Sequence, residues 1–201
     1  MKRTTSGAGI PFAALPIHAF ESPRAFEAWL AEHHDGVPAI AIRLAKKGSG
    51  IASITYAEAL EVALCHGWID GQSKSEGEAT YLQRFGKRKS KSLWSKINRE
   101  HVARLIADGR MRAPGLDEVE RAKADGRWDA AYSSPAAAQV PDDLAAALAK
   151  KPKARAFFDA LDAQNRYAIL HRLETAKKPE TRARRIATFV EKLARGEKLH
   201  P

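Results

Sequence analysis

Apolar and polar residues alternate with two different periods along this chain, and each period predicts one kind of element. Between residues 38 and 45, aliphatic side chains at alternate positions face one side of an extended segment, and Arg43 faces the other side. Two more extended segments, roughly 67–74 and 79–86, flank the turn-forming sequence Ser-Glu-Gly-Glu. The three segments together predict a small antiparallel sheet in which the first strand has one buried face.

Helical periodicity and end signals predict the remaining elements. Ser22 and Pro23 fit the N-cap and first position of one helix, and Thr55 with Glu58 forms a capping box for a second helix that ends at Gly67. From Ser95 onward the apolar residues recur at helical spacing. Helices are expected up to Gly109, from Pro114 to near Gly126, and near 141–149, 152–162, 164–177 and 179–195.

The predicted fold class is α+β, mainly helical, with the sheet in the N-terminal half and a helical C-terminal module. The sequence suggests a loose N-terminal segment at 1–19 and an α+β core at 20–131. A linker at 132–141, rich in Ser, Pro and Ala, leads to the helical module at 142–201. The module and the core can also pack together as one domain.

The net charge of +10 is distributed in blocks. Residues 1–80 carry a net charge of −2, residues 81–112 carry +8, residues 113–149 carry −4, and residues 150–201 carry +8. Such blocks indicate either charge pairing between segments of the fold or an anionic partner such as nucleic acid or a phosphorylated ligand.

The composition favours a cytoplasmic protein. A single cysteine excludes an intrachain disulfide scaffold and suits a reducing compartment. The N-terminal apolar residues are interrupted by prolines and a histidine, which is a poor signal-peptide core, and no apolar run approaches the roughly 20 residues of a membrane span. The sequence does not predict an oligomeric state.

The segment Ala-Leu-Cys-His-Gly-Trp-Ile-Asp-Gly-Gln, residues 63–72, concentrates reactive residue types. Cys65 falls at the C-terminal end of a helix beside two glutamates, where a thiolate is disfavoured. Cys65, His66 and Asp70, with or without His33 or His34, have suitable ligand types but no recognised metal-binding spacing. We therefore predict no catalytic residue, no metal and no cofactor from this segment.

Trp68 and Asp70 fit an architectural role. In an extended segment they share one face, and Gly71 would permit a turn after them. Trp68 is expected to anchor the sheet to a helix. Asp70 is expected either to accept hydrogen bonds or to pair with an arginine, for which Arg182, on the apolar side of the last helix, is the candidate. The alternative for Arg182 is that it binds an anionic ligand.

The basic run from Tyr81 to Asn98 is the strongest functional candidate, because cations alternate with aromatic residues that suit phosphate contacts and base stacking. The run matches no zinc finger, RNP motif or phosphate-binding loop, and a solvated loop explains it equally well. The candidate ligand- or anion-binding residues are Trp68, Asp70, Arg84, Lys87, Arg88, Lys89, Lys91, Trp94, Asn98 and Arg182.

A series of motifs in order resembles the YdeI/OmpD-associated family, also called bacteriocin-protection proteins. They are SITYAEALEVALCHGWIDGQ, YLQRFGKRKSKSLWSKIN, GRM, PGL, AKADGRW, VPDDLAAAL and AKKPETRARRIATFV, from about Phe20 to Leu193. The chain departs from the family pattern at His66, where an aromatic residue is usual, and at Gly86 to Arg88, where the family usually has Thr-Pro-Arg. The resemblance implies an α+β fold with a helical C-terminal module and no established reaction.

Three functions follow as hypotheses. The resemblance favours a non-enzymatic stress or antimicrobial-peptide protection factor that acts by binding, with the basic loop as its contact surface. The alternatives are an enzyme or small anionic-ligand binder with a pocket near Trp68, Asp70, Arg84 and Arg182, and a nucleic-acid-binding protein that uses the basic blocks. The absence of a Ser-His-Asp order, a paired-carboxylate signature or a dinucleotide fingerprint weakens the case for an enzyme.

Overall fold

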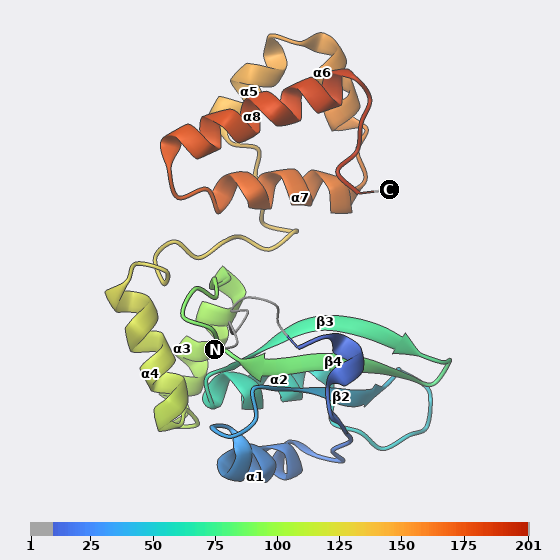
Figure 1. Ribbon diagram of the computed structural model, residues 1–201, viewed down its shortest axis with the longest axis vertical. Coiled ribbons are helices and arrows are strands. Elements are labelled where there is room, and N and C mark those ends of the chain that lie inside the picture. The colour runs from blue at the N-terminus through green and yellow to red at the C-terminus, as the bar shows by residue number, and fades with distance from the viewer. Residues whose placement is uncertain (1–9, 201) are drawn as a thin grey trace, which may run out of the picture. The chain divides into compact units, whose positions relative to one another are not determined.

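The structure is a computed structural model that describes residues 10–200 (Figure 1). These residues form one 3-10 helix, four strands and eight α-helices. Their bounds are η1 (Phe12–Ala14), β1 (Ile17–His18), α1 (Pro23–His33), β2 (Ala39–Ala45), α2 (Tyr56–Cys65), β3 (Trp68–Glu76), β4 (Thr80–Lys87), α3 (Lys96–Ala107), α4 (Ala113–Ala124), α5 (Asp142–Ala149), α6 (Pro152–Asp159), α7 (Ala163–Glu174) and α8 (Pro179–Ala194). The fold is α+β and mainly helical, as predicted.

The chain divides into two compact units. Unit 1 contains the chain up to Ser92 together with Asn98–Trp128, and it holds the whole sheet and helices α1, α2 and α4. Unit 2 contains Leu93–Ile97 and the chain from Asp129 onward, and it holds α5 to α8. Residues 1–9 of the predicted loose N-terminal segment lie outside the described residues, while its remainder includes η1 and β1.

The sheet of unit 1 has the strand order β1-β2-β4-β3 and is mixed. Strands β2, β4 and β3 pair antiparallel as predicted, but β1 pairs parallel to β2, so the expectation of a purely antiparallel sheet was wrong. A strand of two residues has no periodicity to recognise, and only its pairing with β2 defines it. The register shifts between Asp70 and Ser73 of β3, so Gly71 lies at a β-bulge inside the strand and not at a predicted turn.

Both faces of strand β2 are covered. Ile40 and Ile42 are fully buried on the face that also carries Phe85 of β4, and the ring of Phe26 in α1 lies 6.0 Å from the ring of Phe85. On the other face Ala41 is fully buried in a cluster with residues of the segment around η1. The prediction of one buried face was therefore wrong for this part of β2, because the N-terminal segment covers the second face.

Local end signals form as the sequence predicts. The hydroxyl of Ser22 accepts a hydrogen bond from the backbone N–H of Ala25 at 3.3 Å, and Thr55 and Glu58 make both bonds of the capping box. Gly67 follows α2 with a φ of +72°, a left-handed conformation in which a side chain is strained. These caps fix the ends of α1 and α2 against the sheet.

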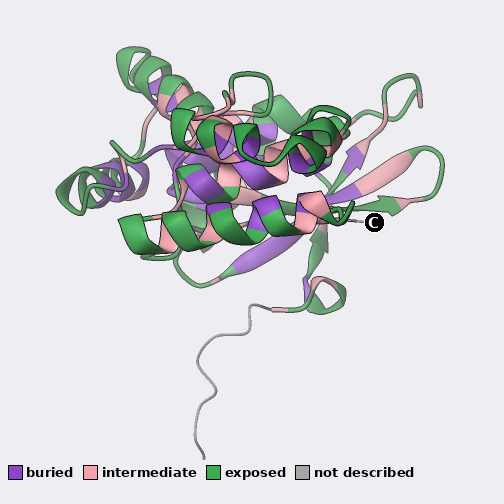
Figure 2. Ribbon diagram, turned by 90° about the horizontal axis from the view of Figure 1, so that it is seen from above, coloured by how far each residue is buried: buried purple, intermediate pink, exposed green. Residues whose placement is uncertain are grey.

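Helices α5 to α8 of unit 2 enclose their own apolar core, and Figure 2 shows that the helices carry buried positions on one side and exposed positions on the other. One arginine ties three of these helices. Arg182 of α8 makes a bidentate ion pair with Asp143 of α5 and donates to the carbonyl of Leu173 in α7 at 2.7 Å. The core residues are Leu144, Leu148, Ala154, Phe158, Ile169, Leu170, Leu173, Ile186, Phe189, Val190 and Leu193.

Within residues 10–200, none of the helices has both the length and the apolar character that crossing a lipid bilayer requires.

Candidate functional site

A cleft of about 700 Å³ opens in unit 1 beside the β-bulge of β3, and we call it the Arg84 cleft. It combines apolar residues of the N-terminal segment with cations of β4 and of the basic loop that follows β4. Its lining residues are Ile10, Pro11, Phe12, Pro38, Ile69, Asp70, Gly71, Gln72, Arg84, Gly86, Lys87, Lys89 and Ser92. A bulge at such a place is typical of sites where a strand must re-aim its side chains.

Arg84 is the central cation of this cleft. Its aliphatic stem lies over Gly71, where a Cβ atom would come within 3.0 Å of the Arg84 Cδ atom, so the glycine gives the stem its room. Its guanidinium donates to the backbone carbonyl of Ile10 at 2.7 Å. No carboxylate within residues 10–200 pairs with Arg84, which leaves its charge available to an anionic group.

The sheet register separates Asp70 from Arg84. Asp70 pairs with Phe85, the residue next to Arg84, and successive residues of a strand point to opposite faces. The carboxylate of Asp70 lies on the helix-covered face, where the hydroxyl of Tyr56 donates to it at 2.9 Å. Asp70 therefore does not supply a carboxylate to Arg84.

Trp68 is fully buried and belongs to the core. Its ring packs edge-on against Trp29 of α1 at 6.0 Å, and its indole N–H donates to the backbone carbonyl of His34 at 3.4 Å. This position confirms the predicted anchor between sheet and helix. A ligand could not reach the ring without displacing α1.

The predicted pair between Asp70 and Arg182 does not form. Arg182 belongs to unit 2, where Asp143 takes two of its guanidinium nitrogens, and the hydrogen bond from Arg182 lowers the pKa of Asp143. The sequence correctly indicated that the half-buried arginine needs a carboxylate. It does not show which carboxylate lies nearby, so the predicted partner was wrong.

The basic run is largely engaged inside the fold. Of the ten basic residues between 81 and 112, five form ion pairs with carboxylates: Lys87 with Asp35, Lys96 with Glu174, Arg104 and Arg110 with Glu61, and Arg112 with Glu27. Arg88 is 5% exposed and Arg99 donates to the carbonyl of Trp128. The charge block thus serves pairing between segments to a large extent.

Of the three aromatic residues of the run, Tyr81 is half-buried, and the other two offer no surface for stacking. Phe85 is fully buried and Trp94 is 1% exposed, so their faces are closed to a base. Asn98 is half-buried in the first turn of α3. The exposed cations here are Lys87 at the end of β4 and Lys89 and Lys91 in the loop after it. The Lys89 backbone N–H donates to the Ser92 hydroxyl, which gives the loop a turn.

Cys65 is packed as predicted. It is 4% exposed, and burial, more than its charged neighbours, raises its pKa to about 11. Such a thiol is protonated at neutral pH and is a poor nucleophile.

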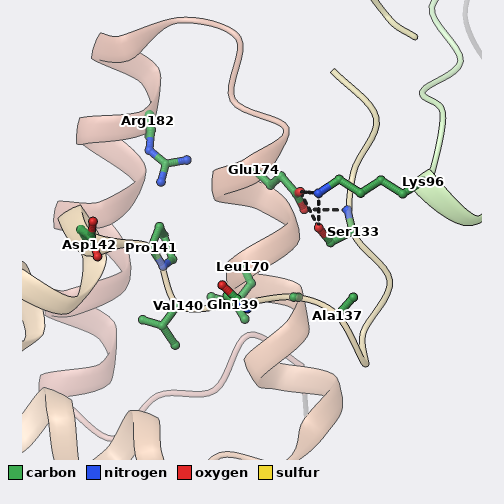
Figure 3. A pocket seen from close by; sticks show the side chains of 11 residues that line it. Lys96, Ser133, Ala137, Gln139, Val140, Pro141, Asp142, Leu170, Glu174 and Arg182 are labelled. Carbon is green, nitrogen blue, oxygen red and sulfur yellow. Dashed lines mark hydrogen bonds and ion pairs between the residues drawn. The ribbon is translucent and has the colours of Figure 1, made fainter. Parts of the chain in front are cut away.

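A second cavity, of about 600 Å³, lies within unit 2, and we call it the Ser133 pocket (Figure 3). Figure 3 shows Lys96, Ser133 and Glu174 meeting at one wall and Arg182 on the opposite side. Its lining residues are Lys96, Ser133, Ala137, Ala138, Gln139, Val140, Pro141, Asp142, Leu170, Glu174 and Arg182.

The polar wall of the Ser133 pocket is a saturated network. The Ser133 hydroxyl donates to Glu174 Oε1 at 2.8 Å and accepts from Lys96 Nζ at 2.9 Å, while the Ser133 backbone N–H donates to Glu174 Oε2 at 2.9 Å. Lys96 Nζ donates to the Ser133 oxygen and lies 3.7 Å from Glu174, so it is not placed to accept a proton from the serine. The backbone N–H that could stabilise an oxyanion is already used. The geometry favours an anchor for the chain over a nucleophile.

Sequence reasoning missed the residues of this network. Lys96, Ser133 and Glu174 are 37 and 41 residues apart, and each has an ordinary local context. Ser133 lies in the segment predicted as a linker, where a serine is expected. Only the pairing of distant segments brings the three side chains together.

Among the residues that the structure describes, no group of three or more His, Cys, Asp and Glu side chains is placed to hold a metal ion.

The chain thus joins an α+β unit with a cationic cleft to a four-helix unit with a polar pocket. Two family models match the chain, and the boundary between the two units at Trp128 and Asp129 falls between the residues they match. Residues 18–118 match DUF8412, a domain of unknown function, and residues 137–196 match a family described as bacteriocin-protection, YdeI or OmpD-associated. The chain therefore belongs to the DUF8412 family, and its C-terminal region is similar to the YdeI/OmpD-associated family. No curated protein and no solved structure matches the chain.

Proposed function

We propose that this protein is a non-enzymatic, cytoplasmic protection factor against bacteriocins or antimicrobial peptides, and that it acts by binding an anionic group of its partner in the Arg84 cleft. The description of the matching C-terminal family supports the protective role. The single observation that carries the binding site is Arg84 itself, which faces a 700 Å³ cleft with no carboxylate partner among residues 10–200.

The composition of the cleft supports an extended, anionic partner over a small neutral ligand. Lys89 lies at the rim and adds a second cation, while Phe12 and Ile69 give apolar contact area. A carboxylate or phosphate oxygen would accept hydrogen bonds from the free guanidinium nitrogens, which suit planar bidentate recognition. Binding, and not turnover, is favoured because neither Cys65 nor Ser133 has the surroundings of a nucleophile.

Complementation of a deletion strain tests both parts of the proposal. The strain that lacks the gene is challenged with a panel of bacteriocins and antimicrobial peptides, and then carries wild type, Arg84→Gln, Arg84→Lys or Lys47→Gln. Lys47 is an exposed lysine outside the cleft, so Lys47→Gln removes the same charge elsewhere on unit 1.

We expect the deletion to increase sensitivity, wild type and Lys47→Gln to restore resistance, and Arg84→Gln to fail at unchanged protein level and melting temperature. Arg84→Lys should restore part of the activity, because it keeps the charge and loses the planar fork. Unchanged sensitivity of the deletion strain would contradict the protective role. Full rescue by Arg84→Gln would contradict the cleft as the binding site. Cell fractionation tests the cytoplasmic location.

A further inference from the structure

Two histidines follow two neighbouring helices directly. His34 is the C-cap of α1 and His66 is the C-cap of α2. Both line one groove of about 460 Å³ in unit 1, which lies apart from the residues of the Arg84 cleft. The groove is lined by Arg24, Glu27, Ala28, Ala31, His34, His66, Arg112 and Pro114.

The backbone fixes the same tautomer on both rings. Nδ1 of His34 lies 3.1 Å from the carbonyl oxygen of Leu30, and Nδ1 of His66 lies 3.1 Å from the carbonyl oxygen of Val62. A carbonyl oxygen only accepts, so Nδ1 carries the hydrogen in each ring and the lone pair of the neutral ring is on Nε2. A backbone carbonyl at the second ring nitrogen is the arrangement that orients metal-binding histidines.

The His66 ring is buried but its Nε2 atom is not used by the fold. The residue is 5% exposed, and within residues 10–200 no hydrogen-bond partner is present for Nε2. His34 Nε2 lies 3.4 Å from Asp35 Oδ2, but Asp35 is also held by Lys87 at 2.7 Å.

The two rings are close to the separation that one shared ion requires. Their centroids are 6.2 Å apart. With metal–nitrogen distances of about 2.1 Å and a tetrahedral angle, two coordinating imidazoles have centroids roughly 5 Å apart. The two rings must therefore move slightly closer together when an ion binds. The charge of nearby Arg112 is offset by its ion pair with Glu27.

We propose that His34 and His66 bind one divalent transition-metal ion of the zinc, nickel or copper class through their Nε2 atoms. Imidazole nitrogen selects these ions over magnesium and calcium, which prefer oxygen ligands. No third side chain of the described residues completes the site, so water or a small ligand in the groove fills the remaining positions. The ion is therefore exchangeable, and its open positions face the groove.

Titration of tag-free, full-length protein with Zn²⁺ tests this site, with calorimetry for stoichiometry and imidazole ¹⁵N chemical shifts for the coordinating nitrogen. The key variant is His34→Gln, because His34 is partly exposed and its replacement should leave the fold intact. His33→Gln is the matched control: His33 is the adjacent residue, but its ring stacks on Trp29 and does not line the groove.

We expect one ion per chain, Nε2 shifts on two histidines, and a loss of at least about 10-fold in affinity in His34→Gln, in line with the 10–100-fold effects of even outer-shell changes. His33→Gln should bind as wild type does, and His66→Gln should lose binding if circular dichroism shows that it folds. No saturable binding at millimolar zinc would overturn the proposal. Equal affinity in His34→Gln, or an equal loss in His33→Gln, would overturn it as well. None of these results depends on the protective function or on Arg84.

Discussion

Two glycines end helices of this protein in the left-handed conformation, but only one of them has close neighbours. Gly67 follows α2 and Gly126 follows α4, and both have a positive φ, +72° and +76°. A Cβ atom at Gly67 would lie 2.8 Å from the carbonyl oxygen of Pro114 and 3.0 Å from Glu118 Cγ, whereas at Gly126 it would meet nothing within 4 Å. A side chain at either position would strain the backbone, but only at Gly67 would it also collide with neighbouring atoms.

We therefore predict that Gly67→Ala destabilises the protein clearly more than Gly126→Ala. The left-handed conformation should cost each variant about 1 kcal/mol, and the contact with backbone atoms of α4 adds to this in Gly67→Ala alone. Urea unfolding followed by circular dichroism measures both free energies. Equal losses in the two variants would show that α4 moves aside without cost and would refute the steric argument.

At the scale of single helices, capping also makes stability depend on pH. Asp162 is the N-cap of α7 and accepts from the backbone N–H of Asn165 at 2.8 Å. This hydrogen bond, with a side-chain bond from Asn165, lowers the pKa of Asp162 to about 2. The folded-state pKa is below the unfolded-state value of about 3.9, so the ionised cap stabilises the fold at higher pH and this contribution disappears as the pH falls from about 4 to about 2.

The variant Asp162→Asn distinguishes the stabilisation due to the charge of Asp162 from that due to its capping hydrogen bond. Asparagine caps a helix about as well as aspartate, so the variant keeps the hydrogen bond and loses the titration. We expect wild type to be more stable than Asp162→Asn at pH 6, with a difference that shrinks as the pH approaches 3. Denaturant midpoints across this range measure the effect. Asp159→Asn, which removes an exposed carboxylate paired with Arg155, is the control, and an equally strong pH dependence there would contradict the cap as the cause.

Elements with local signals were predictable, and those defined by distant partners were not. The capping box at Thr55 and the terminating glycine at Gly67 need only neighbouring residues, and both form. The two-residue strand β1 exists only through its pairing with β2, and Asp143, the partner of Arg182, is 39 residues away from it. A sequence indicates that such groups need partners, but the packed fold decides which partner is closest.

The same limit applied to the candidate site. Arg84 and Lys89 were selected from the charge pattern, and the structure places both at one cleft. Trp94 is buried by packing, and the register of β3 places the Asp70 carboxylate on the face opposite Arg84. The spacing of charges along the sequence predicts neither. Gly71 was assigned to a turn because a glycine after a short strand usually marks one, whereas here it gives room to the Arg84 stem.

For the whole molecule, the net charge of +10 overstates the surface available to a polyanion. Within the block at 81–112, half of the cations are paired with carboxylates, and the exposed ones that remain gather in the short loop around Lys89 and Lys91. Few free cations release few counterions from a nucleic acid, and the buried rings of Phe85 and Trp94 add no stacking. The affinity of this block for nucleic acid should therefore be weak and purely electrostatic.

We predict that any binding to single-stranded DNA disappears between about 50 and 200 mM salt, because salt ions compete with the few phosphate contacts that hold the DNA. Fluorescence anisotropy of a labelled oligonucleotide measures this at each salt concentration. Replacement of both Lys89 and Lys91 by Gln should abolish the binding seen at low salt, whereas Arg104→Gln, at a cation paired with Glu61, should change it little. Saturable binding that persists at the higher salt concentration would mean that the basic blocks act together on nucleic acid, and the anionic partner of the Arg84 cleft would then have to be sought among nucleic acids.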